Sequence, residues 1–224
     1  MVDYYNMELF LNLPNEVFWL WLSGATFLVM TLVFLLGPWR REKSELMGAF
    51  LGFLGGMSLF PLLRGASMLW ENPFLMYLAA FAATTGSAFV VKFPLLSIAN
   101  IKLRKIFFYA ALTIAWILVL WLLVSGADPM VSMKAASVYM IVFSGLSGAY
   151  MVWKGFLFKE PTTKIKCLGG GCSIWFCCFL THSLVLTVGM IALAKLFMIL
   201  TPITLVFTVF IARRLSIQPK LKVT

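Results

Sequence analysis

Apolar stretches about as long as a membrane is thick recur along this chain, separated by short polar breaks. Crossing the hydrocarbon core of a bilayer takes about 20 mostly apolar residues in a helix. We therefore predict an all-α integral membrane protein with seven transmembrane helices, forming a single domain over residues 1–224. The predicted spans cover residues 17–38, 46–63, 74–93, 106–124, 133–154, 173–191 and 195–212.

The last two spans are the hardest to separate, because only the segment from Gly189 to Lys195 interrupts their apolar run. Read as one helix, the run would hold about 40 residues and extend roughly 60 Å at 1.5 Å per residue. No bilayer accommodates a helix of that length. The sequence therefore predicts a turn near Gly189.

Basic residues gather in alternate loops, after the first, third, fifth and seventh spans, and only Arg64, Lys134 and Lys195 fall on the other side. Lysine and arginine concentrate on the cytoplasmic side of membranes. The pattern predicts an outer N-terminal segment (1–16) and a cytoplasmic tail (213–224). The residues that set this orientation are Arg40, Arg41, Lys43, Lys92, Lys102, Arg104, Lys105, Lys154, Lys159, Lys164, Lys166, Arg213, Arg214, Lys220 and Lys222.

Composition agrees with a membrane location and changes how the net charge is interpreted. The chain is 62% hydrophobic and 12% charged, where soluble domains carry about 25% charged residues. The net charge of +10 is divided among short loops, which favours topology and anionic lipid head groups over nucleic acid. We expect the cell membrane as the location, the lipid bilayer as a partner, and no nucleic-acid partner. Asp3 and Glu8 stand where a cleavable signal peptide would be basic, so the first span is expected to remain.

Small residues at helical spacing predict close helix packing. Gly48, Gly52 and Gly56 share one face of the second span, and Ala79 and Ala83 share one face of the third. Small residues let helix backbones approach closely in membranes. Packing within the chain and an interface with a partner subunit or a second copy both fit this pattern.

Few ionisable groups fall at membrane depth, where such groups are costly and often functional. His182 lies in the sixth span beside Thr181, Lys195 lies near the outer end of the seventh, and Arg64 follows the second. These four residues are the candidate ligand-binding positions. No aspartate or glutamate lies inside a predicted span, which disfavours proton pumps and ion-coupled transporters. A single histidine does not indicate haem or a metal, so no catalytic residue, metal or cofactor is predicted.

Four cysteines cluster near the cytoplasmic end of the sixth span, where thiols stay reduced. Their spacing does not match the paired knuckles of a zinc ribbon. The run Gly169–Gly171 between them is interpreted as a flexible turn, since no phosphate-loop lysine follows it. Small apolar thiols, lipidation sites and labile metal ligands all remain open for Cys167, Cys172, Cys177 and Cys178.

Three functions remain open from these patterns. The first is a non-enzymatic membrane protein, receptor-like or an integral subunit of a larger complex, acting through helix contacts and a small apolar ligand. The second is a transporter of small solutes or lipids, because three helices, one linking helix and three further helices suggest a parallel repeat. The third is a cofactor-binding protein centred on His182.

One resemblance rests on hydropathy and loop charge. It is carried by Trp39-Arg40-Arg41, by the segment from Lys102 to Lys105, and by the run from Thr201-Pro202 to Arg214-Leu215. In this layout the chain resembles the seven-helix N-terminal sensor regions of bacterial histidine kinases. That family has an output domain after the last helix, and none follows Leu215 in this sequence. The resemblance therefore implies a sensor whose output passes to a separate partner.

Overall fold

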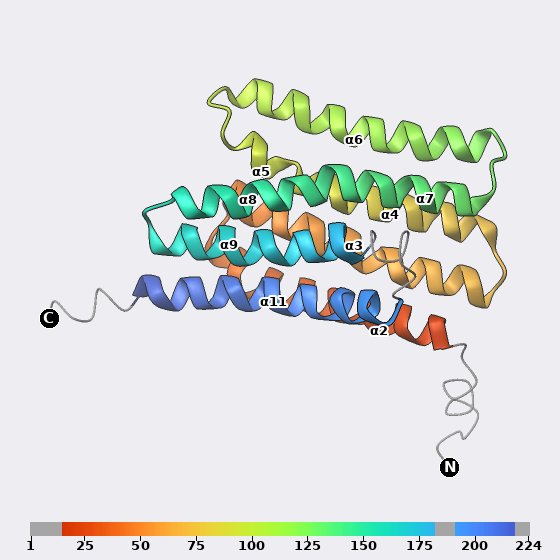
Figure 1. Cartoon of the computed structure of the whole chain (residues 1–224), viewed down its shortest axis with the longest axis horizontal. Helices are drawn as coiled ribbons and strands as arrows, with labels where there is room; N and C mark the ends of the chain where they lie inside the picture. The colour runs from red at the N-terminus through yellow and green to blue at the C-terminus, as the bar shows by residue number, and fades with distance from the viewer. Residues whose placement is uncertain (1–14, 182–190, 218–224) are drawn as a thin grey trace, which may run out of the picture.

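The computed structural model describes residues 15–181 and 191–217, and every regular element in these ranges is helical. The helices lie side by side as rods, each long rod running opposite to the long rod before it in the chain (Figure 1). The elements are α2 (Asn15–Phe34), the π-helix η1 (Leu35–Trp39), α3 (Glu45–Leu69), α4 (Pro73–Val90), α5 (Lys92–Leu95), α6 (Ile101–Val124), α7 (Pro129–Tyr139), the π-helix η2 (Met140–Gly145), α8 (Leu146–Leu157), α9 (Pro161–Trp175), the π-helix η3 (Phe176–Thr181) and α11 (Ile191–Ile217).

Five of the α-helices begin at a side chain that caps them. The first backbone N–H groups of a helix have no partner within it, and a side-chain oxygen at the preceding position accepts from them. Proline follows the cap in α4, α7 and α9, where its missing N–H costs nothing. The capping residues are Ser44, Asn72, Asn100, Asp128 and Glu160.

Within the described residues, six helical segments are long and apolar enough to cross a membrane: residues 16–39, 45–69, 73–95, 101–124, 129–157 and 194–215. Five of these correspond to the first five predicted spans and the sixth to the predicted last span. The rod formed by α9 and η3 is not among them, and the expected turn near Gly189 lies outside the described residues. The protein is therefore a helical chain with six such segments, whereas seven spans and their orientation stay predictions.

The sixth rod differs from its prediction. It begins at Pro161, not near residue 173, because Glu160 caps it and Pro161 occupies its first position. Lys164 and Lys166, expected in a loop, lie on this helix. The run Gly169–Gly171, expected to be a flexible turn, lies in its middle.

The glycine run is helical because three neighbours approach it closely. A Cβ added to Gly169 would lie 2.4 Å from the Thr208 side chain of α11, and one added to Gly171 would lie 2.8 Å from Met151 of α8. At Gly170 the ring of Phe50 from α3 would be 2.5 Å away. The close approach offsets the cost of glycine in a helix, about 1 kcal/mol each.

The predicted glycine face of α3 packs within the chain. A Cβ on Gly56 would lie 2.4 Å from the Cα of Gly86, and one on Gly52 would lie 2.3 Å from the ring of Phe89, so both positions meet α4. Gly48 faces the ring of Trp39 at an ordinary 3.5 Å. Ala79 and Ala83 on α4 are fully buried.

Phenylalanine rings fill the interior around α3. Phe27 of α2 meets Phe53 edge to face, and Phe34 meets Phe50 in the same geometry. Phe50 also lies 5.1 Å from the ring of Phe93. The outward faces stay apolar and uncovered, most of all on α6, as expected for helices that face lipid. Large exposed side chains of α6 include Ile106, Ile114, Ile117, Trp121 and Val124.

The Gly56–Gly86 approach makes a prediction with an internal control. Gly56→Ala should lower the free energy of unfolding by about 1–3 kcal/mol, because the new methyl group overlaps the α4 backbone. Gly55→Ala meets nothing within 4 Å and should be neutral or stabilising by up to about 1 kcal/mol. Thermal unfolding in mild detergent, followed by circular dichroism, measures both. Equal midpoints for the two variants would contradict this account of the α3–α4 contact.

Candidate functional site

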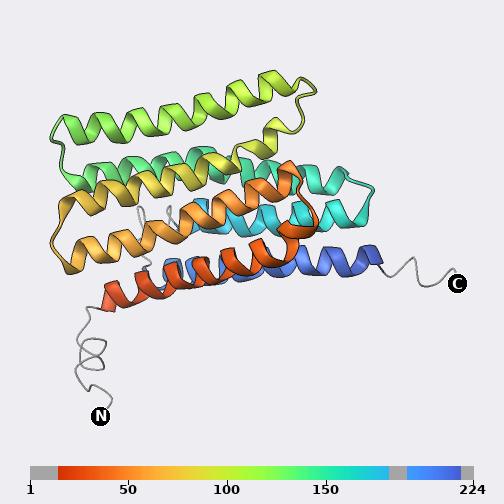
Figure 2. The same ribbon diagram turned by 180° about the vertical axis from the view of Figure 1, so that it is seen from behind.

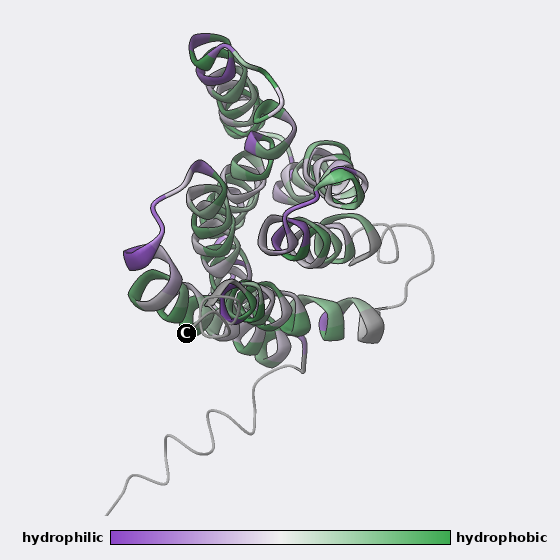
Figure 3. Cartoon of the chain, turned by 90° about the vertical axis from the view of Figure 1, so that its left-hand side faces the viewer, coloured by the Kyte–Doolittle hydropathy of each residue, from purple (hydrophilic) through white to green (hydrophobic). Residues whose placement is uncertain are grey.

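Cavities line one end of the bundle, which we call the basic end. At this end η1, α8 and α11 finish, and α3, α6 and α9 begin. The basic end lies on the left of Figure 1. Figure 3 looks onto this end and shows hydrophilic segments where the chain passes between rods. The described basic residues predicted to be cytoplasmic are in these segments and the adjoining helix turns.

The first cavity, which we call the Lys166 pocket, has a volume of about 260 Å³. It lies between the end of η1, the start of α3, the start of α9 and the end of α11. Three cationic side chains line it, together with one carboxylate and one threonine. Its lining residues are Pro38, Arg41, Glu42, Met47, Thr162, Lys166, Val209 and Arg213.

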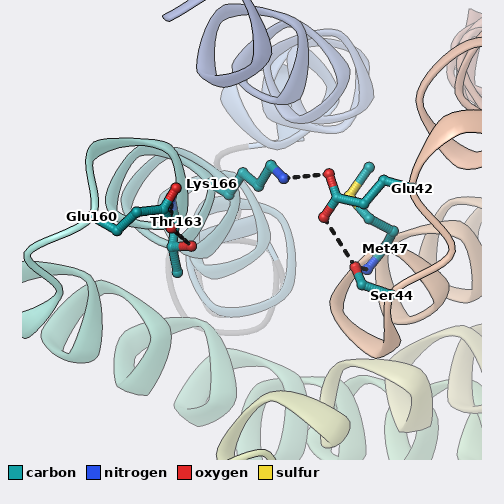
Figure 4. Close-up of polar contacts among 6 residues, drawn as sticks. All are labelled: Glu42, Ser44, Met47, Glu160, Thr163 and Lys166. Carbon is teal, nitrogen blue, oxygen red and sulfur yellow. Dashed lines mark hydrogen bonds and ion pairs between the residues drawn. The ribbon is translucent and has the colours of Figure 1, made fainter. Parts of the chain in front are cut away.

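Lys166 is the most enclosed charge of this pocket. Its side chain is only 7% exposed, and its Nζ donates to Glu42 Oε2 at 2.6 Å (Figure 4). Ser44 Oγ donates to the other oxygen of Glu42 at 3.2 Å. A buried ammonium group without a partner is strongly unfavourable. The ion pair therefore holds the η1–α3 connection against α9.

The start of α9 fixes where Lys166 points. Glu160 accepts hydrogen bonds from both the backbone N–H and the hydroxyl of Thr163, as Figure 4 shows. The Thr163 hydroxyl bond is the main cause that holds the pKa of Glu160 below its usual range. A carboxylate that stays ionised also suits the positive end of the helix dipole. This cap sets the register that places Lys166 in the second turn, facing Glu42.

A second cavity, which we call the Cys167 pocket, has a volume of about 360 Å³ and a mainly apolar wall. Lys154 supplies its only charge, and the Lys154 Nζ lies 5.0 Å from the ring centre of Trp153 and 5.8 Å from that of Tyr150. Cationic groups are attracted to the faces of such rings. The lining residues are Leu46, Phe93, Leu96, Ser97, Tyr150, Met151, Lys154, Phe158 and Cys167.

A third, smaller cavity of about 140 Å³ lies between α3, α5 and α6. An ion pair of 2.7 Å joins Arg104 to Glu45 at its edge. Lys92 Nζ stands 4.3 Å from the ring centre of Phe108. Lys105 is a third cation of its lining, but the cavity has only about half the volume of the Lys166 pocket and leaves less room for a ligand.

The candidate residues at membrane depth do not form one site in the part of the chain that is described. His182 lies outside the described residues, and Thr181 is the last residue of η3. Lys195 lies in the second turn of α11 and is partly exposed. Arg64 was expected just beyond the second span, but α3 continues to Leu69, so Arg64 lies within the helix.

The cysteines sit on the inner side of the α9–η3 rod as free thiols. Cys167, Cys177 and Cys178 are buried and Cys172 is partly so. The π-helices η2 and η3 lie against each other there, and Ser144 Oγ donates to the backbone oxygen of Ser87 at 3.0 Å, joining η2 to α4. π-Helical turns often occur at functional positions.

The two pockets escaped sequence reasoning for a physical reason. Each is built from segments far apart in the chain, so knowing that Arg41 and Arg213 are basic does not show that they face one cavity. One local signal was available at Lys166: Glu160 followed by Pro161 is a helix start, which would have placed Lys166 on a helix and not in a loop.

Comparison with protein-family models, with curated proteins and with solved structures found no match for this chain. Inferences about function therefore depend on the residues and their geometry.

The two ion pairs of the basic end should differ in strength. Glu42→Gln leaves the enclosed Lys166 ammonium with a neutral partner, and we expect a loss of about 1–3 kcal/mol in the free energy of unfolding. Glu45→Gln removes a more exposed carboxylate, 57% accessible, and should cost less than about 1 kcal/mol. Unfolding in mixed micelles with increasing denaturing detergent measures both. An equal or larger loss for Glu45→Gln would show that burial of Lys166 does not govern the first pair.

Proposed function

We propose that this chain is a non-enzymatic, receptor-like membrane protein that binds a phosphate-bearing anion in the Lys166 pocket. One observation carries the proposal: Arg41, Lys166 and Arg213 line a single cavity with only one carboxylate, Glu42. Like charges that converge at one site repel one another unless an anion offsets them. Arg41 and Lys166 alone exceed the single negative charge of Glu42, so the lining favours an anionic ligand.

Phosphate suits this set of side chains better than a single carboxylate does. Guanidinium groups bind phosphate oxygens through paired hydrogen bonds, and an ammonium group adds a compact positive charge. Thr162 lies on the same wall and carries a hydroxyl that can donate to a further oxygen. Glu42 already holds Lys166 at 2.6 Å, so an incoming phosphate would compete with this carboxylate for the ammonium group.

The position of the pocket supports a lipid head group as the source of the phosphate. The pocket lies at the ends of apolar rods, among basic segments that are predicted to be cytoplasmic. Basic pockets between transmembrane helices on that side of a membrane bind anionic head groups. The head group would lie between Arg41 and Lys166 while its acyl chains stay against the outer faces of α2 and α11.

A receptor-like role follows from where the ligand would act. The pocket joins η1 and α3 to α9 and α11, so an anion that replaces Glu42 would change the contact between these helices. A ligand can shift a conformational equilibrium only through such differential contacts. The resemblance to sensor regions belongs to the same proposal. So does the expected role as a subunit of a larger membrane assembly.

Thermal unfolding in nanodiscs tests the anion site. Phosphatidic acid in phosphatidylcholine discs should raise the unfolding midpoint of the wild-type protein relative to phosphatidylcholine alone, because a ligand stabilises the state it binds. Inorganic phosphate added to the plain discs forms the second arm. A response to phosphate ions alone would assign the pocket to a soluble anion, whereas a response to phosphatidic acid alone would assign it to a head group.

Neighbouring arginines provide matched controls. Arg41→Gln and Arg213→Gln should abolish most of the stabilisation, whereas Arg40→Gln and Arg214→Gln, which remove the same charge outside the pocket lining, should retain it. Glu42→Gln should increase the midpoint shift, because the competing carboxylate is gone. Equal losses for all four arginine variants would mean a general surface attraction and would refute a specific site.

Transport is the second candidate, favoured by one observation. Helices before and after α6 form two groups of three, with α6 outside, as in carriers built from parallel repeats. In vesicles loaded with labelled phosphate or organophosphate, a carrier would release label faster than protein-free vesicles do, and Lys166→Gln would abolish the difference. Binding without release would favour the receptor-like role.

A further inference from the structure

Two equivalent groups of three rods make up most of the bundle. We call α2–η1, α3 and α4–α5 the first unit, and α7–η2–α8, α9–η3 and α11 the second. In each unit the middle rod packs against both others. Between the units, α2 contacts α11 and α4 contacts α7, so the six rods form a closed ring of neighbours. Figures 1 and 2 show from opposite sides that these rods run along one common direction. Helix α6 packs on the outside, against α4 and α7.

A single offset along the chain relates the two units. The middle helices begin at Glu45 and at Pro161, which are 116 positions apart (45 to 161). The same offset separates their capping residues, Ser44 and Glu160, and the residues whose backbone N–H groups donate to those caps, Met47 and Thr163. These three positions belong to one helix start in each unit, so they give a single point of alignment between the units.

This offset also superposes the two pockets. Each pocket lies on a seam between the units, lined by the first and second rods of one unit and by the second and third rods of the other. Lining residues of the Lys166 pocket correspond to lining residues of the Cys167 pocket in five pairs: Pro38 with Lys154, Glu42 with Phe158, Thr162 with Leu46, Val209 with Phe93, and Arg213 with Ser97.

Three of the five pairs lose charge or polarity in the second seam, one stays apolar, and one gains a charge. Phe158 stands where the first seam has Glu42, Leu46 where it has Thr162, and Ser97 where it has Arg213. The counterpart of Lys166 is Phe50, a fully buried ring of the core. The second seam has thus replaced charged and polar lining with apolar lining, while Lys154 adds one cation at its rim.

We propose that the Cys167 pocket is a second ligand site, which binds one alkyl chain that ends in a single carboxylate, as in a fatty acid. The apolar wall of Phe93, Met151 and Cys167 would pack against the chain. Lys154 would pair with the carboxylate, and its position over the rings of Tyr150 and Trp153 keeps the ammonium at the rim. This assignment goes beyond the anion site, and neither depends on the other.

Charge and volume favour a fatty acid over a phospholipid. One cation matches one negative charge, whereas the three cations of the first seam match a multiply charged phosphate. The cavity of about 360 Å³ is near the small end of the usual range for small-molecule sites, about 300–1,000 Å³. It therefore suits one chain better than two.

Photo-crosslinking tests the second site in the whole protein. Palmitic acid with a diazirine on its chain is added to the protein in phosphatidylcholine nanodiscs, and labelled peptides are identified by mass spectrometry. We expect labelling of the segments around Phe93, Met151 and Phe158. Unlabelled palmitate should compete, and hexadecanol, which lacks the charge, should compete about fivefold less well, as a partly exposed ion pair predicts.

Variants separate a bound carboxylate from general lipid contact. Lys154→Gln should remove the preference for palmitate over hexadecanol, whereas Lys159→Gln, which removes a nearby charge outside the pocket, should keep it. Cys167→Phe fills the cavity and should abolish labelling, with its unfolding midpoint measured to confirm folding.

Other outcomes would overturn the proposal. These are labelling that spreads over the exposed face of α6, equal competition by phosphatidic acid, or a preference for palmitate that persists in Lys154→Gln. Phosphate-dependent stabilisation of the Lys154→Gln protein should be unchanged, so a failure here is distinguishable from a failure of the anion site.

Discussion

The approach of Phe50 to Gly170 is the contact on which the rest of the bundle depends. It joins α3 to α9, the middle helices of the two three-rod groups, where any side chain at position 170 would meet the ring at 2.5 Å. Because α9 has glycine at three consecutive positions, α11 and α8 can approach on the flanking sides as well. In lipid there is no hydrophobic force between helices, so close packing of small residues has to supply much of the association. Lys166 lies one helical turn before Gly170 on α9, at the seam between the two groups, where it forms an ion pair with Glu42.

The arrangement explains why the two seams differ. Lys166 and Phe50 occupy equivalent positions, yet one is a cation turned to a carboxylate and the other a ring in the core. Phe50 fills the space that Gly170 leaves open, and on the other side Leu54, the counterpart of Gly170, is a buried leucine. A lysine in both positions would require two enclosed ion pairs, each with its own desolvation cost. With one charged seam and one mainly apolar seam, the bundle has a polar site at one side while apolar side chains still fill its centre.

Much of the fold follows from the sequence, since hydropathy and span length depend on local composition. The first five spans lie within helices, and Asn72-Pro73 and Asp128-Pro129 are readable helix starts. The same reasoning placed the start of the sixth span near residue 173, although α9 begins at Pro161. Lys164, Lys166 and the glycine run lower the hydropathy of this segment, whereas its packing against neighbouring helices keeps it helical. The Lys166 pocket was harder to predict from the sequence than the fold. Glu42 and Lys166 are far apart in sequence, and only the order in which the rods surround the axis brings them together.

The order of the spans suggested a repeat of three helices, but the side chains of the two groups give little sign of it, for a related reason. Membrane helices need only apolar residues on most faces, so two copies of one unit can lose their identity while keeping their geometry. The features that persist are those with no apolar substitute. A cap must accept the N–H three residues later, and Ser44 and Glu160 both do so although their side chains differ. Pocket walls are under no such constraint, because an apolar wall and a charged wall are both stable if each meets a matching partner. The two seams therefore differ in chemistry, one lined by charges and the other mainly by apolar side chains, while both middle helices keep a capped start.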